Sequence, residues 1–198
     1  MTAPRRVVLA TGNAGKQREF AALLAPLRYE ILLQTAWGIT AAEEAGDTFE
    51  ANALLKARHA AGTANLPALA DDSGIEVDAL GGRPGVWSAR YAGVAATDAD
   101  NNALLLRELA GVALPARTAR YRCVIAYVRF ANDPAPVFAR GAWEGVIAER
   151  PAGAGGFGYD PLFIPQGLAI TAAQMSAADK NAISHRGQAL TALLRLLP

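Results

Sequence analysis

Residues 11–16, TGNAGK, have the composition of a phosphate-binding turn. They stand between a short apolar run, residues 7–10, and a stretch with apolar side chains at helical spacing. At a strand-to-helix turn the backbone N–H groups and the helix dipole can receive phosphate, and Lys16 adds a positive charge. The turn is not a P-loop, because only two residues separate its first glycine from the Gly–Lys pair and glutamine follows the lysine. Taken alone, the motif also suits an ordinary strand-to-helix turn, and its spacing disfavours a P-loop kinase or GTPase.

Two acidic pairs, Glu43 with Glu44 and Asp71 with Asp72, supply candidate ligands for a cation. Magnesium binds through one or two carboxylates together with substrate phosphates and water. Either pair alone is also typical of a solvated loop or turn, but both pairs with a phosphate-binding lysine favour a metal site. Asp72 is the candidate general base for the attacking water, and Asp71 is the alternative.

Two later segments have the residues expected of a base pocket. In GGFGYDP, residues 155–161, Phe157 stands between glycines that let the backbone approach a flat ligand. The alternative is a glycine-rich loop with packed aromatic side chains. The motif SHRG places His185 and Arg186 at a predicted helix start, shortly after Lys180. Hydrogen-bond donors there would favour a 6-keto purine over adenine, although guanine also carries the 6-keto group.

The composition narrows the class of protein. The 198 residues include 19 basic and 18 acidic side chains, a balance that suits a small polar ligand better than nucleic acid. The single cysteine, Cys123, excludes an intrachain disulfide and a cysteine-based zinc site. We expect no membrane partner and a cytoplasmic location, because no run of roughly 18 apolar residues occurs. With no repeat or linker, residues 1–198 are expected to form one domain.

Alternating strand and helix patterns predict an α/β domain on a mixed sheet. Expected strands are residues 7–10, 29–33, 66–70, 120–130 and 136–147, the last two forming an antiparallel hairpin. The polar residues 71–74 are expected to form a turn after which the apolar pattern resumes. Expected helices follow Gly15 and the capping patterns Asp47–Glu50, Thr97–Asp100 and Ser176–Asp179. A final helix is expected over about residues 184–197. Asn52 and Lys56 share one helix face and could both reach phosphate, although such residues are more often merely exposed.

Five motifs in order resemble the inosine triphosphate pyrophosphatase family: TGNAGK, FEANALLKA at 49–57, ADDSG at 70–74, GGFGYDP and SHRG. The match covers nearly the whole chain, and GGRPGVWSARYAG at 81–93 is similar to the bacterial branch. The resemblance implies hydrolysis of ITP, dITP and XTP to monophosphate and pyrophosphate, which keeps these nucleotides out of DNA and RNA. It also implies Mg²⁺, a homodimer, and an elongated mixed central sheet flanked by helices, with an active-site cleft between two lobes.

The resemblance also implies roles for individual residues. Asp72 is the expected proton acceptor with Lys16 beside it, and Glu43 and Asp72 are the expected metal ligands, with Glu44 left open as an alternative to Glu43. The implied substrate contacts are Thr11, Gly12, Asn13, Ala14, Gly15, Lys16, Ser73, Phe157, Gly158, Tyr159, Asp160, Lys180, His185 and Arg186. A pyrophosphatase for pyrimidine triphosphates and a nonenzymatic nucleotide sensor are the competing hypotheses. The two acidic pairs disfavour the sensor, since binding alone needs no water-activating carboxylate.

Overall fold

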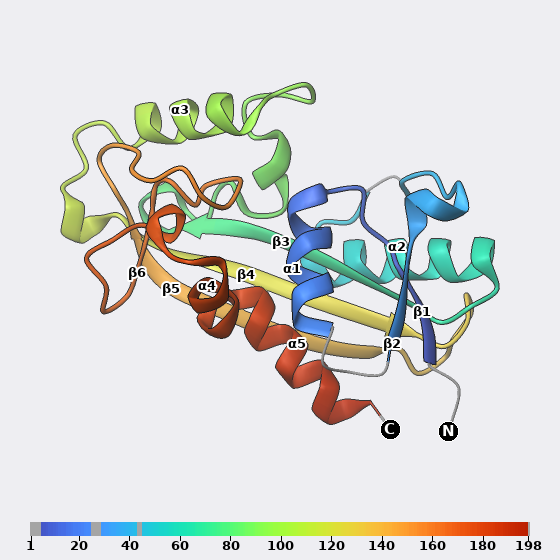
Figure 1. Ribbon diagram of the computed structural model, residues 1–198. Helices are drawn as coiled ribbons and strands as arrows, with labels where there is room; N and C mark the ends of the chain where they lie inside the picture. The colour runs from blue at the N-terminus through green and yellow to red at the C-terminus, as the bar shows by residue number, and fades with distance from the viewer. Residues whose placement is uncertain (1–4, 25–28, 43–44, 198) are drawn as a thin grey trace. The chain divides into compact units, whose positions relative to one another are not determined.

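A computed structural model describes residues 5–24, 29–42 and 45–197. Its six strands form one sheet in the order β2-β1-β3-β4-β5-β6 (Figure 1). β1 runs parallel to both β2 and β3, whereas β5 and β6 are antiparallel, so the predicted mixed sheet is confirmed. The strands are β1 Arg5–Leu9, β2 Tyr29–Leu33, β3 Ala68–Val77, β4 Thr118–Val128, β5 Val137–Ile147 and β6 Phe163–Pro165.

Five α-helices accompany the sheet in the described residues, and the α/β class is therefore confirmed. They are α1 Ala14–Leu24, α2 Phe49–Ala64, α3 Asp98–Glu108, α4 Ala177–Ile183 and α5 His185–Leu196. Short 3-10 helices cover Gln34–Trp37, Asp78–Leu80, Gly85–Arg90, Leu114–Ala116 and Ala172–Gln174. No helix in the described ranges is long and apolar enough to span a membrane.

The chain divides into two compact units, each built from separated stretches. Unit 1 comprises residues 1–72, 123–140 and 189–198, and unit 2 comprises residues 73–122 and 141–188. β3, β4 and β5 each contribute residues to both units. The expected single domain and the expected cleft between two lobes stay predictions.

Unit 1 has an apolar cluster on each face of its strands, because successive strand residues point to opposite faces. Alternate residues of β1, β3 and β4 pack with the alanine face of α2, namely Val8, Ala68, Ala70, Val124, Ala126 and Val128 with Ala53, Ala57, Ala60 and Ala61. The residues between them pack with α1 and α5, namely Val7, Leu9, Leu69, Cys123 and Ile125 with Phe20, Leu24, Ala189, Leu190 and Leu193. The helices predicted after Gly15, after residue 47 and over about residues 184–197 are thus confirmed as α1, α2 and α5.

Two details near α2 and β3 differ from the sequence-based expectation. The N-cap of α2 is Thr48 rather than Asp47, because the Thr48 hydroxyl accepts the Ala51 N–H at 3.1 Å. β3 does not end before Asp71 but continues through the DDSG segment to Val77. This strand lies between β1 and β4, so its neighbours outweigh the turn propensity of aspartate, serine and glycine. Asp71 and Asp72 therefore lie in mid-strand, where both are buried.

The predicted hairpin is confirmed. β4 and β5 are neighbours in the sheet and are joined by residues 129–136, a connection too short for the crossover that parallel strands need. Asp133, almost fully buried in this loop, accepts the backbone N–H groups of Arg129 at 2.9 Å and Ala135 at 3.0 Å. The Arg129 guanidinium also donates to this carboxylate and holds the pKa of Asp133 well below its usual range.

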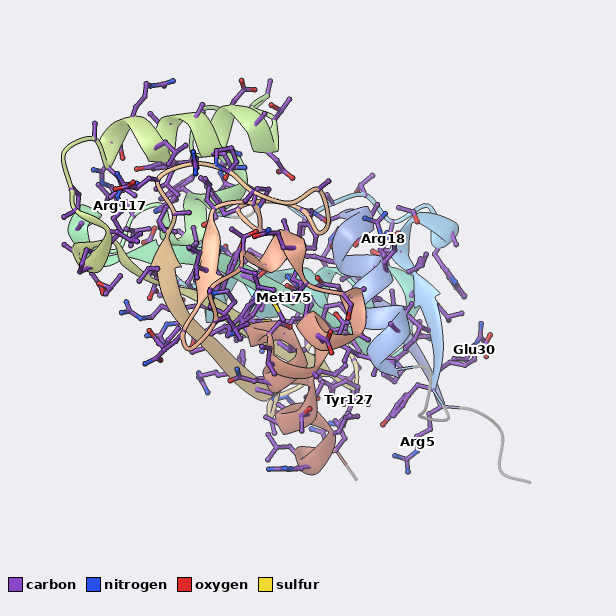
Figure 2. All side chains as sticks on the ribbon, turned by 60° about the vertical axis from the view of Figure 1, so that its left-hand side comes forward. Arg5, Arg18, Glu30, Arg117, Tyr127 and Met175 are labelled. Carbon is purple, nitrogen blue, oxygen red and sulfur yellow. The ribbon has the colours of Figure 1, made fainter. Side chains whose placement is uncertain are left out.

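Unit 2 packs α3 against its own part of the sheet. Leu105 of α3 and Leu109, which caps its C-terminal end, join an apolar cluster with Ile75, Val77 and Tyr121. The helix begins at the predicted capping box, in which Thr97 and Asp100 bond reciprocally. Beyond its other end lies Arg117, which is labelled in Figure 2.

Arg117 is buried although its guanidinium binds only carbonyl oxygens. Its Nε donates to the Val112 carbonyl at 2.9 Å, Nη1 to Ala148 at 3.2 Å and Nη2 to Leu109 at 3.0 Å. The carbonyl groups near the end of a helix have no partner inside the helix. Arg117 therefore satisfies the end of α3 and ties it to the residue that follows β5.

Candidate active site

The turn between β1 and α1 is held by its own polar side chains. The Asn13 N–H donates to Thr11 Oγ1 at 3.2 Å, and the Lys16 N–H donates to Asn13 Oδ1 at 3.0 Å. The Gln17 amide donates to the Thr11 carbonyl at 2.9 Å. Two of the N–H groups predicted to face phosphate are thus used within the turn, and Asn13 caps the start of α1. The strand-to-helix turn predicted from the sequence is confirmed.

Lys16 points its ammonium group at a buried carboxylate. Its Nζ lies 2.9 Å from Asp71 Oδ2, and the Asp71 side chain is fully buried while that of Lys16 is 14% exposed. Burial of a carboxylate requires a partner of opposite charge. The turn predicted to bind phosphate and Asp71 of β3, which are far apart in the sequence, therefore meet within unit 1.

Asp72 is held by α2. Lys56 Nζ lies 2.8 Å from Asp72 Oδ1, and Asn52 Nδ2 lies 3.3 Å from Asp72 Oδ2. Asn52 is completely buried, and its Oδ1 accepts the Gly46 N–H at 2.8 Å, which fixes the orientation of its amide. Asn52 and Lys56 thus belong to the site. Their spacing along one helix face indicated that both could reach the site. The general tendency of lysine side chains to be exposed argued against that interpretation.

Two ion pairs, Lys16 with Asp71 and Lys56 with Asp72, therefore lie among the residues predicted to bind phosphate and metal. Their charges cancel in this structure. A triphosphate bound here would add several negative charges, with which the two lysines would pair, and the two aspartates would then be available to a metal cation.

The predicted metal ligands are only partly within the described residues. Glu43 and its alternative Glu44 lie outside them, and Asp72 is the described member of the set. No cluster of three His, Cys, Asp or Glu residues occurs in the part of the chain that the structure describes. The oxygen donors of Asp71 and Asp72 fit Mg²⁺, which takes one or two carboxylates and fills its other positions with water and phosphate.

In unit 2, the GGFGYDP segment forms a tight turn around the Asp160 carboxylate. The Phe157 N–H donates to Asp160 Oδ2 at 2.9 Å. Gly156 has φ of +72°, and a Cβ on it would lie 2.0 Å from the same oxygen. Only glycine fits there, because both the backbone angle and the space exclude a side chain.

Asp160 also binds Lys180 and Tyr121 in the interior of unit 2. Lys180 Nζ lies 2.5 Å from Asp160 Oδ2, and the Tyr121 hydroxyl donates to Oδ1 at 3.3 Å. Burial, and then the negative charge of Asp160, raise the pKa of the Tyr121 hydroxyl well above its usual range, so the group stays a donor. Asp160 was predicted as a substrate contact. In the structure its carboxylate binds the Phe157 N–H, Lys180 and Tyr121 and so stabilises this turn.

Phe157 lies beside two of the predicted base-pocket cations. Lys180 Nζ is 4.9 Å and the Arg186 guanidinium carbon 5.6 Å from the centre of its ring. Arg186 is almost completely buried, and its Nη2 donates to Ser73 Oγ at 3.0 Å. The structure thus brings together Ser73, Phe157 and Arg186, which come from three separate motifs, and Lys180 of α4.

His185 and Tyr159 point into the packed interior of unit 2. The His185 ring stacks on Tyr121 at 4.5 Å between centres and 5° between planes, with Trp143 next to both. The Tyr159 hydroxyl donates to the Ser88 carbonyl at 2.9 Å. Substrate contacts of these two residues stay predictions, and what the structure shows is that they support the turn and the start of α5.

The charged pairs of unit 1 and the aromatic and cationic set of unit 2 are joined in sequence by Asp72 and Ser73, consecutive residues of β3. The model of the Ham1 family matches residues 7–196. The chain belongs to the Ham1 family.

Several Ham1 relatives are similar over nearly their full length. The chain is 54% identical to the dITP/XTP pyrophosphatase of Yersinia pseudotuberculosis and 55% identical to that of Shigella flexneri, each over 98% of both chains. The solved HAM1 protein from Coxiella burnetii has a TM-score of 0.89 at 47% identity, over 97% of this chain and 98% of that one. The nucleoside-triphosphatase / dITP/XTP pyrophosphatase from Mycobacterium abscessus has a TM-score of 0.74 at 41% identity, over 96% and 98%.

Proposed function

We propose that this Ham1 protein hydrolyses ITP, dITP and XTP to the nucleoside monophosphate and pyrophosphate. The observation that carries the proposal is the arrangement of Lys16 against Asp71 and Lys56 against Asp72. It sets two phosphate-binding cations beside two buried carboxylates, the combination that water attack on a phosphoanhydride requires. The names of the relatives, dITP/XTP pyrophosphatase, support this substrate class.

In the proposed reaction a water oxygen forms a bond to the α-phosphorus while the bond from that phosphorus to the bridging oxygen of the β-phosphate breaks. Asp72 accepts the proton of the water, and pyrophosphate leaves with the bonding electrons. Lys16 and Lys56 stabilise the charge on the leaving group. Asp72 with Glu43 or Glu44 would hold Mg²⁺, which when bound would supply further positive charge for the triphosphate.

The aromatic and cationic side chains of unit 2 select the base. The purine stacks on Phe157, while Lys180 and Arg186 donate hydrogen bonds to the 6-keto oxygen that inosine and xanthosine carry and adenine lacks. The contacts that already hold Phe157 and Arg186 support this role, because they fix these two side chains before the substrate arrives.

The biological setting belongs to the same proposal. Removal of ITP, dITP and XTP cleanses the nucleotide pool and keeps these bases out of DNA and RNA. We infer a homodimer in the cytoplasm that acts on free nucleotides and uses neither nucleic acid nor membrane as a partner. The nearly equal numbers of basic and acidic residues support a free nucleotide over a nucleic-acid substrate.

One assay tests the reaction. Purified protein is incubated with magnesium and ITP, XTP, GTP, ATP or dTTP, and the products are separated and identified. We expect monophosphate and pyrophosphate from ITP and XTP and little turnover of the standard nucleotides. Orthophosphate would contradict a pyrophosphatase, turnover of dTTP would assign a pyrimidine substrate, and no product from any nucleotide would favour a sensor.

Replacing Phe157 tests the base pocket. Phe157→Ala should raise KM for ITP about tenfold and leave kcat within about twofold, because stacking on an aromatic ring contributes mainly to binding. The matched control is Phe130→Ala, which removes an exposed phenylalanine that also has an arginine, Arg129, over its ring. An unchanged KM in Phe157→Ala would show that this ring only packs.

A further inference from the structure

Helix α3 holds the turn that carries Phe157 through the backbone of Gly158. The Gly158 N–H donates to Asp98 Oδ2 at 2.6 Å, and the Gly158 carbonyl accepts from Asn102 Nδ2 at 2.9 Å. Asp98 is the first residue of α3 and Asn102 follows one helical turn later, so both side chains lie on one face of the helix. In Figure 1 the orange segment after β5 passes beside α3.

The turn needs such a support because its own backbone is permissive. Gly156 and Gly158, on either side of Phe157, both have positive φ, +72° and +61°. Glycine loses more conformational freedom on folding than any other residue, so polar contacts must fix a turn of this kind. The Phe157 N–H and carbonyl are bound by Asp160 within the turn. The two backbone polar groups of the next residue, Gly158, are bound by α3.

The contact with Gly158 fixes the orientation of the Asn102 side-chain amide. Because the Gly158 carbonyl only accepts, the Asn102 nitrogen must face it. The Asn102 oxygen is then buried with no hydrogen-bond partner among the described residues. A buried unsatisfied polar atom in a folded protein calls for an explanation, and support of the Phe157 turn is one.

We infer that Asp98 and Asn102 are positioning residues for nucleotide binding: they set the place of the Phe157 ring by holding the Gly158 peptide from α3. The inference rests on the proposed function, because it assumes that Phe157 stacks on the base. Neither side chain is assigned a contact with substrate. Their loss should therefore weaken recognition of the base and leave recognition of the phosphates unchanged.

The test measures the dissociation constants of inosine monophosphate and of pyrophosphate by calorimetry with magnesium. In Asp98→Ala and Asn102→Ala, we expect the Kd of inosine monophosphate to rise about five- to tenfold, as for loss of one hydrogen bond. The Kd of pyrophosphate, which has no base, should stay within about twofold, since no base contact is involved. Asp98→Asn keeps an oxygen that accepts the Gly158 N–H and should restore most of the affinity.

Asn101→Ala is the matched control on the same helix. The Asn101 amide also binds two backbone groups, the Ala92 N–H at 2.8 Å and the Ala89 carbonyl at 3.2 Å, but it holds a different segment. This variant should lower Tm without changing the Kd of inosine monophosphate.

The positioning role is overturned if folded Asp98→Ala and Asn102→Ala bind inosine monophosphate like the parent protein. It is also overturned if both ligands weaken equally, or if Asp98→Asn is as impaired as Asp98→Ala. A parent protein that binds inosine monophosphate but does not hydrolyse ITP would instead contradict the proposed function and leave the positioning role open to the same measurements.

Discussion

Asp72→Asn is expected to lower kcat for ITP by about 10²- to 10⁴-fold, the range that general acid–base catalysis contributes. An amide cannot take up the proton of the attacking water. Its oxygen can still accept from Lys56, whose Nζ is 2.8 Å from Asp72 Oδ1, while its nitrogen replaces the oxygen that accepts from Asn52, so we expect some loss of stability but a retained fold. Steady-state kinetics on a variant with the circular dichroism spectrum of the parent protein give the measurement.

Two further carboxylates make this experiment specific. Asp47→Asn changes an exposed aspartate just before α2 and should leave kcat unchanged. Asp71→Asn removes the charge that faces Lys16 and tests the alternative general base. Near-parental turnover in Asp72→Asn, together with loss of turnover in Asp71→Asn, would transfer the proton-accepting role to Asp71.

Arg117→Ala is expected to lower the free energy of unfolding by about 3–5 kcal/mol, because it leaves two buried carbonyl groups and one part-buried carbonyl group without their charged donor. Urea denaturation followed by circular dichroism gives the difference. Arg107→Ala, which removes an exposed arginine from α3, should change the free energy of unfolding by less than about 0.5 kcal/mol. Equal stability of Arg117→Ala and the parent protein would mean that other groups or water satisfy these carbonyls.

The fold was largely predictable because local signals and packing agree. The capping box at Thr97 and the hairpin loop at Asp133 are local features. The apolar runs in β1 and β4 follow from burial of both faces of these strands. β3 was harder, since its DDSG segment has the composition of a turn. What keeps it extended is pairing in the sheet and the lysines of α1 and α2, which are distant in sequence.

The candidate site was predictable as a set of segments but not as a set of contacts. Glycines and charges in the motifs pointed to the phosphate turn and to Phe157. The partners of Asp72 came from α2, where Asn52 is buried and Lys56 faces inward, and no local pattern distinguishes such residues from exposed ones. The bond from Arg117 to Ala148 and the α3 contacts to Gly158 were missed for the same reason, because they join segments far apart in the sequence.

The division of the chain between the two units has a consequence for synthesis on the ribosome. All residues of unit 2 have been made once Gln188 is added, but unit 1 still lacks its last stretch. That stretch contains Ala189, Leu190 and Leu193, which pack with residues as early as Val7. A nascent chain at this stage keeps apolar surface of unit 1 uncovered, and such surface attracts chaperones and promotes aggregation. Substitutions in α5 should therefore reduce the yield of soluble protein in cells more than their effect on the finished protein would suggest.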